Sequence, residues 1–138
     1  MKYAVHTNLR DDVLEVQLAG ERSPFEIEIA EDAIDTWVHI LDLCRRHGVD
    51  SVLASFALTG PTTALVSVAV ARRLETIGFD RSLRVALLDH NGQSRPFNDF
   101  GCRVAAGHGW QFRSFGDAAS ALRWLKERDT QEPQAAQG

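Results

Sequence analysis

The stretch SVLASFAL at residues 51–58 decides how this chain folds. It is a nearly continuous apolar run, which is typical of a central β-strand covered on both faces. The next five residues, TGPTT at 59–63, break the strand and begin a helix, because proline is favoured at the first helical position and threonine can cap the free amides. The segment from Leu65 to Leu74 is apolar around most of its girth, so we expect this helix to sit deep, and Gly78 to end it.

On the amino-terminal side, two short segments alternate apolar and polar residues. Residues 3–9 and 14–18 are separated by a polar turn at 10–12, which predicts a β-hairpin. Residues 25–29 also alternate, with Phe25 and two isoleucines separated by glutamates, which predicts an additional edge strand. From Asp32 the apolar residues follow helical spacing as far as Cys44, and Gly48 provides the expected left-handed stop.

On the carboxyl-terminal side, residues 83–88 form a second buried strand. We expect Leu53, Phe56, Val85 and Leu87 on the central strands to be almost fully buried. Residues 94–96 begin a third helix, with Phe97, Phe100 and Val104 on its inner side. A last short strand at 110–113 is followed by a helix that Asp117 caps.

The resulting order is β-β-α-β-α-β-α-β-α. It predicts an α/β fold, a small mixed β-sheet with right-handed crossovers that about four helices cover. With 138 residues the chain has room for one domain, which we assign to residues 1–128. Residues 129–138 are rich in Gln, Ala and Glu and lack apolar periodicity, so we expect a disordered tail there.

Composition excludes several classes of protein. A net charge of −4 and a pI near 5.7 argue against a nucleic-acid partner, because proteins that bind nucleic acids need a basic surface against the phosphates. No apolar run approaches the length of about 20 residues that a membrane helix needs, and the start MKYA opens no signal peptide. Cys44 and Cys102 lack metal-ligand spacing, and we expect free buried thiols in a reducing cytoplasm.

The ordered set of elements over residues 3–126 resembles the anti-sigma-factor antagonist (STAS-like) fold, in particular its divergent single-domain group. The buried strand at 51–58 feeds a polar turn and a helix, and the ending FGDAASALRWL at 115–125 looks like the family's common close, an acidic cap before an Ala/Leu-rich helix. The resemblance implies a non-enzymatic regulatory or interaction module with a protein partner.

The handover from the central strand to the second helix departs from the family. Its regulatory members carry an Asp-Ser pair there, whose serine is a phosphorylation switch, whereas this chain has no acidic residue in that turn. Thr59, Thr62 and Thr63 occupy the neighbourhood. They are the candidate phospho-acceptor or interaction residues, and the alternative is that they only cap the helix.

Other constellations are weaker. Asp89 and His90 are adjacent, and adjacent residues on a turn rarely face the same way, so we interpret them as part of a turn rather than as a catalytic dyad. Ser94 is not surrounded by the Gly-x-Ser-x-Gly pattern of a nucleophile elbow. The five histidines form no zinc-binding pattern. The sequence therefore predicts no catalytic residue, no metal and no cofactor.

Two functions remain open from the sequence. The first is a cytoplasmic interaction module that docks a protein through the turn and helix start at 59–63. The alternative is a small-ligand or lipid-binding domain, with a pocket between the second and third helices lined by Leu65, Val68, Phe97 and Phe100. The sequence leaves the oligomeric state open.

Overall fold

A computed structural model describes residues 3–137 of the chain, and the side chains of residues 3–127. Nine elements follow in the order β-β-α-β-α-β-α-β-α, as the sequence predicts. They are β1 (Ala4–Arg10), β2 (Val13–Glu21), α1 (Glu26–His47), β3 (Ser51–Thr59), α2 (Ala64–Thr76), β4 (Arg84–Asp89), α3 (Arg95–Gly107), β5 (Gln111–Phe115) and α4 (Ala118–Gln137). The expected disordered tail, 129–138, lies outside the residues whose side chains are described.

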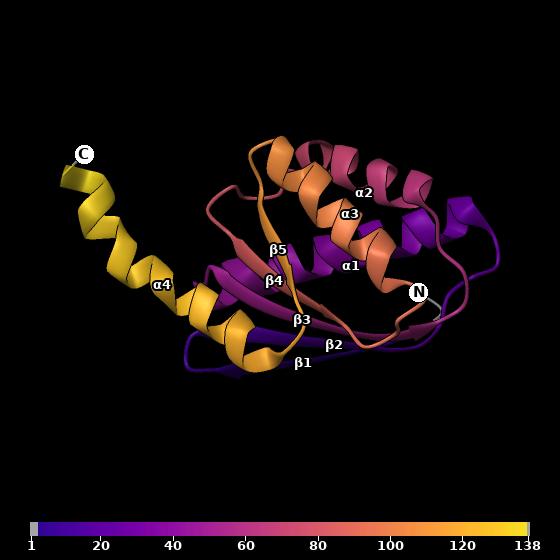
Figure 1. The fold of residues 1–138 in the computed structure, drawn as a ribbon, viewed down its shortest axis with the longest axis horizontal. Coiled ribbons are helices and arrows are strands. Elements are labelled where there is room, and N and C mark those ends of the chain that lie inside the picture. The colour runs from indigo at the N-terminus through magenta and orange to yellow at the C-terminus, as the bar shows by residue number, and fades with distance from the viewer. Residues whose placement is uncertain (1–2, 138) are drawn as a thin grey trace.

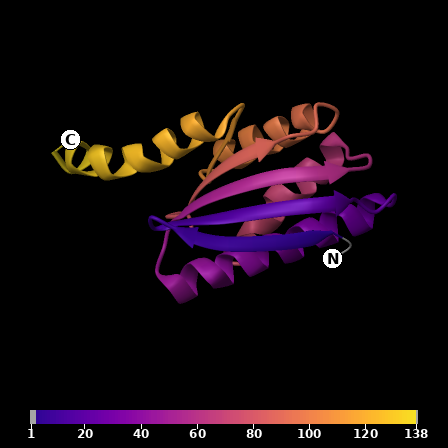
Figure 2. The same cartoon turned by 90° about the horizontal axis from the view of Figure 1, so that it is seen from below.

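The five strands form one mixed sheet in the order β1-β2-β3-β4-β5, as Figure 2 shows from below. β1 pairs with β2 antiparallel, and every later pair is parallel. Sequential parallel strands joined by right-handed crossovers place all their connecting helices on one face. Accordingly α1, α2 and α3 gather on one side of the sheet (Figure 1).

The helices α1–α3 cover one face of the parallel strands, and α4 covers part of the other face, chiefly over β4. On the face under α1–α3, residues such as Val52, Phe56, Val85 and Leu87 join the main core, while Leu53 belongs to a smaller core beneath α4 on the other face. The prediction that the central strands are buried is confirmed, because Leu53, Phe56, Val85 and Leu87 are all at most 8% exposed. Both cysteines are free and buried, also as predicted.

The edge strand predicted at residues 25–29 is wrong. α1 begins at Glu26, and the amide of Ile29 already donates to the Phe25 carbonyl at 3.0 Å. Two glutamates in the first turn suit the positive end of the helix dipole. Phe25 and Ile27 are 63% and 75% exposed, so their alternation with glutamate does not mark a buried strand face.

Two expectations about helix faces are also corrected. α2 does not sit deep: only Val66, Ala71 and Leu74 are buried, since the helix packs against α1 and α3 rather than deep within the core. On α3 the buried residues are Cys102 and Ala105. Of the three residues that the sequence predicts on the inner side, Val104 is half-buried and packs against the main core, whereas Phe97 and Phe100 are half-buried and do not belong to that core.

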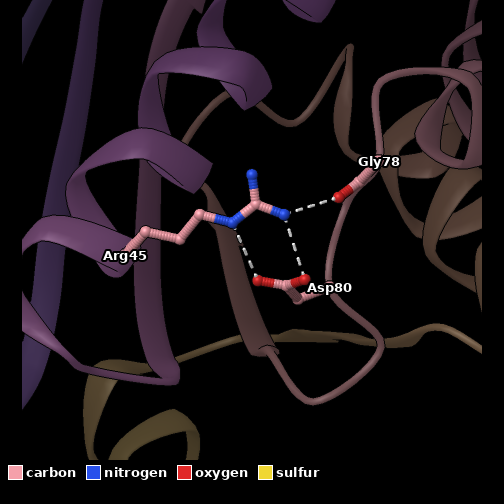
Figure 3. Close-up of polar contacts among 3 residues, drawn as sticks. All are labelled: Arg45, Gly78 and Asp80. Atoms are coloured by element: carbon pink, nitrogen blue, oxygen red, sulfur yellow. Dashed lines mark hydrogen bonds and ion pairs between the residues drawn. The ribbon is translucent and has the colours of Figure 1, made fainter.

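An arginine fastens the carboxyl end of α1 to the connection before β4 (Figure 3). Arg45 donates to both carboxylate oxygens of Asp80, at 3.3 and 3.2 Å, and to the Gly78 carbonyl at 3.1 Å. The contact is solvent-exposed, with half or nearly half of both side chains accessible. Next to it, Gly48 at φ +64° ends α1 in the left-handed conformation that the sequence predicts.

Candidate functional site

A pocket of about 90 Å³ lies between α1, α2, α3 and the sheet. Its deeper wall is apolar and comes from the main core, with Trp37, Phe56, Leu87 and Phe112 among its residues. These rings hold one another in place, since Trp37 meets Phe112 edge-on at a centroid distance of 5.2 Å. The interior therefore presents a rigid, apolar surface.

The outer part of the pocket carries polar side chains. They come from the first residues of the chain, from the segments that follow β2 and β3, and from all three helices: Tyr3, Arg22, Ser23, Asp32, Thr36, Thr62, Ser67 and Asn98. Because the parallel strands end at the same edge of the sheet, their connections to α1, α2 and α3 meet there, and Figure 1 shows the three helix starts at that end. This edge is where α/β sheets ordinarily bind ligands.

Arg22 directly follows β2 and is only 7% exposed. Its amide continues the β2–β3 ladder by donating to the Thr59 carbonyl at 2.8 Å. One guanidinium nitrogen, Nη1, donates to the carbonyls of Leu58 and Gly60 at 3.4 and 3.1 Å. Nε and Nη2 have no hydrogen-bond partner among the described residues, and no carboxylate there forms an ion pair with Arg22.

Burial lowers the pKa of Arg22 below its ordinary value, while the charge of Asp89 opposes that shift. Arginine stays protonated even so, because its ordinary pKa lies above 12. The pocket wall therefore contains a buried cation whose charge is not neutralised by direct contact.

Asp89, at the end of β4, is 5% exposed and fully engaged by donors of its own. It accepts from the Asn91 amide at 2.9 Å, and from the Ser94 hydroxyl and the Asn98 side-chain amide, each at 2.7 Å. This set fixes the start of α3 at the pocket edge. As predicted, Asp89 and His90 form no dyad, because Asp89 is buried in this network and His90 is exposed.

Tyr3 closes another side of the pocket. The Thr36 hydroxyl donates its single proton to the Asp32 carbonyl at 2.8 Å. In the contact between Tyr3 and Thr36 Oγ1, at 2.9 Å, the Tyr3 hydroxyl is therefore the donor. Burial, the largest cause, raises the pKa of the Tyr3 phenol. Tyr3 is thus a neutral wall residue that ties the start of β1 to α1.

The three candidate threonines have separate positions. Thr59 ends β3, is exposed, and donates its hydroxyl to the Gly20 carbonyl at 3.3 Å. Thr63 caps α2 by accepting from the Val66 amide at 3.3 Å, as the capping interpretation predicts. Thr62 is half-buried, lines the pocket, and has no hydrogen-bond partner for its hydroxyl among the described side chains.

The four residues of the expected pocket lie outside this one. Leu65 is 72% exposed, Val68, Phe97 and Phe100 are half-buried, and none of them lines the pocket. Their neighbours do, because Val66 and Ser67 on α2 and Asn98 and Gly101 on α3 face it instead. The sequence interpretation predicts a pocket between the second and third helices, and in the structure other residues of these two helices line the pocket described here.

Arg22 is the residue that sequence reasoning missed. It lies in the polar segment between β2 and α1, where a charged residue is expected to be exposed to solvent. The available signal was its position directly after a strand that pairs with the central one, since strand-end residues of a parallel sheet gather at the ligand edge. Its burial results from the packing of β3 and the turn at 59–63.

The thiol of Cys102 lines the pocket, and burial, the largest cause, raises its pKa to about 12. At neutral pH it is a neutral, apolar wall group rather than a nucleophile. Among the described residues no three His, Cys, Asp or Glu side chains cluster in a way that could hold a metal ion. None of the helices in that part of the chain has the length and hydropathy to cross a membrane.

Comparison with known proteins adds no assignment: none of the family models matches this chain, and the search of curated proteins finds no significant match.

Proposed function

We propose that this protein is a non-enzymatic binding module of the STAS-like type that holds a small, largely apolar molecule in the pocket beneath α1, α2 and α3. The observation that carries the proposal is the apolar pocket at the carboxyl ends of the parallel strands. A space of about 90 Å³ is smaller than the ~150 Å³ cavity that binds benzene. The fitting ligand is therefore a short or branched chain of about three to five carbon atoms.

The neutral Cys102 thiol and the hydrogen-bonded Asp89 support binding rather than chemistry as the role. Neither group is paired with a base that would activate a nucleophile. A cytoplasmic location fits the two free cysteines.

The test is titration with a small uncharged probe, 3-methylbutanamide, followed by the indole N–H signals of the tryptophans. Trp37 lines the pocket, whereas Trp124 packs with α4 on the opposite face of the sheet. We expect the Trp37 signal to move with probe concentration and the Trp124 signal to stay.

Two variants of α2 provide a matched pair. Ala71 is buried and lines the pocket, so Ala71→Leu should fill the space and abolish the Trp37 response. Ala69 lies on the same helix but does not line the pocket, and Ala69→Leu should leave the response intact. A response that survives Ala71→Leu, or no response in the parent protein, would refute pocket binding.

A second candidate function is docking of a protein partner through the turn and helix start at 59–63. It is favoured by exposed apolar side chains at the starts of α1 and α2, namely Phe25, Ile27 and Leu65. Figure 1 shows the starts of α1 and α2 at the same end of the molecule, and exposed apolar side chains that form one patch commonly mark interaction surfaces. The docking surface would then lie at the same end of the molecule as the pocket, where the parallel strands end.

Docking is tested by comparing proteins retained from native lysate by the parent chain and by Leu65→Ser and Thr62→Glu variants. Both changes should remove the same partner, while Val38→Ser, at a 44% exposed position further along α1, should retain it. Identical partner sets for all four baits would exclude this docking site.

A further inference from the structure

The pocket contains a charge that the proposed function leaves unexplained. Arg22 is 93% buried, and the described residues offer its guanidinium two backbone carbonyls but no carboxylate within ion-pair distance. Buried charges are ordinarily paired, because the loss of hydration is costly. Nε and Nη2 are not fully buried, so the unpaired edge of this cation is open to an anionic partner that comes from outside the chain.

We propose that the ligand of this pocket carries one carboxylate group, which pairs with the guanidinium of Arg22 while its short apolar chain enters the cavity. The inference rests on the proposed function, since it names the chemical class of the molecule that the pocket binds. Nε and Nη2 make no hydrogen bond to the described residues. This planar edge is the one that binds the two oxygens of a carboxylate side by side.

Thr62 provides a second donor near the same group. It lines the pocket, it is half-buried, and its hydroxyl has no hydrogen-bond partner in the described part of the chain. The turn that carries Thr62 is held to Arg22 through the Gly60 carbonyl, at 3.1 Å from Nη1. A carboxylate bound by Arg22 can thus accept a further hydrogen bond from the Thr62 hydroxyl.

The charges around the pocket favour a monoanion over a phosphate. Asp89 acts on Arg22 electrostatically, and Asp32 lines the same pocket. A phosphate monoester carries up to two negative charges at neutral pH and would meet one cation and two carboxylates. A carboxylate carries one charge, which the single guanidinium neutralises.

The experiment compares four probes with one carbon skeleton on the full chain: 3-methylbutanoate, 3-methylbutanamide, 3-methylbutylamine and 3-methylbutyl phosphate. Dissociation constants are measured by calorimetry, and the Trp37 indole signal reports the site. We expect the carboxylate to bind at least about tenfold more tightly than its uncharged amide, as hydrogen bonds to a charged group are the stronger ones. The amine and the phosphate should bind more weakly than the carboxylate.

Variants then assign the preference to Arg22. Arg22→Met should reduce the ratio of carboxylate to amide affinity to about one, and Arg22→Lys, which keeps the charge but loses the planar edge, should retain part of it. Thr62→Val leaves Arg22 and its carbonyl contacts in place and should weaken carboxylate binding several-fold. Arg45→Met removes an equal charge at the far end of α1 and should change no dissociation constant.

Each remaining outcome overturns the inference in a distinct way. Equal binding of amide and carboxylate would refute the acid while leaving pocket binding intact. Tighter binding of the amine would assign the site to a cation held by Asp32, and tighter binding of the phosphate would assign it to a dianion. If none of the four probes binds, the proposed function fails as well.

Discussion

The chain places an arginine at each end of α1, and the two are held in opposite ways. Arg45, at the carboxyl end, is exposed and makes a two-pronged ion pair with Asp80 (Figure 3). Arg22, just before the amino end, is buried and contacts only carbonyl oxygens. An exposed cation has solvent as well as its partner, whereas a buried one depends on what the protein or a ligand supplies. The comparison indicates that the charge of Arg45 is neutralised within the chain, whereas that of Arg22 is not paired by direct contact.

The largest effect should come from shortening a core leucine at either end. Leu87 lines the pocket, and Leu83 precedes β4 at the far end; both are at most 4% exposed. Each change to alanine should lower the free energy of unfolding by ~2–5 kcal/mol, measured by denaturant titration. Only Leu87→Ala should also alter probe binding, because it enlarges the pocket. A loss below about 1 kcal/mol for Leu87→Ala would contradict its place in the core.

Next in size is the removal of the buried arginine. Arg22→Met removes the side-chain donor of the Gly60 carbonyl, whereas the Leu58 carbonyl still accepts from the Asn91 side-chain amide at 2.9 Å. A buried acceptor left unsatisfied costs about 1–3 kcal/mol. We expect a loss in that range by denaturant titration. Adding 3-methylbutanoate should stabilise the parent more than the variant, which makes the difference larger. A variant as stable as the parent would show that the Gly60 carbonyl finds another donor.

The two ends also differ at their left-handed glycines. A Cβ at Gly48 would meet no atom within 4 Å, so Gly48→Ala should cost only the conformational penalty of about 1–2 kcal/mol. At Gly60, with φ +92°, a Cβ would lie 3.3 Å from the Arg22 carbonyl oxygen and 3.4 Å from its Cβ. Gly60→Ala should therefore destabilise more than Gly48→Ala in thermal melts and weaken probe binding. Equal melting temperatures would show that the turn at Gly60 adapts freely.

The smallest effect should be that of Arg45→Met, since exposed ion pairs contribute little and are screened by salt. We expect a small drop in melting temperature at low salt that disappears at high salt. A drop that persists at high salt would show that the Gly78 contact, rather than the charge, fastens α1.

The sequence predicted the fold because its local patterns agreed with the tertiary arrangement. The apolar run at 51–58, the hairpin and the glycine stop at Gly48 each depend on neighbours in the sequence. The strand predicted at 25–29 failed because an alternating pattern cannot distinguish a strand from the first turn of a helix whose isoleucines point both inward and outward.

The site was harder to predict, because its residues meet only when several strand ends converge. Thr62 was identified from the helix start that follows the central strand, a local signal. Arg22, in contrast, is enclosed by carbonyls some 36 to 38 positions away. Which faces of α2 and α3 are buried likewise depends on tertiary packing, since α2 packs against both α1 and α3 and α3 packs against β5, and residue spacing alone does not encode these contacts.

The placement of α4 has a practical consequence for biosensor design. Ala121 and Leu125 fasten this helix to the sheet face opposite the pocket, and Figure 1 shows the carboxyl terminus pointing away from the three helix starts. Tyr3, by comparison, stands in the pocket wall itself. Immobilising the protein through its carboxyl end should keep the pocket facing the solution, while a bulky amino-terminal fusion should crowd the pocket.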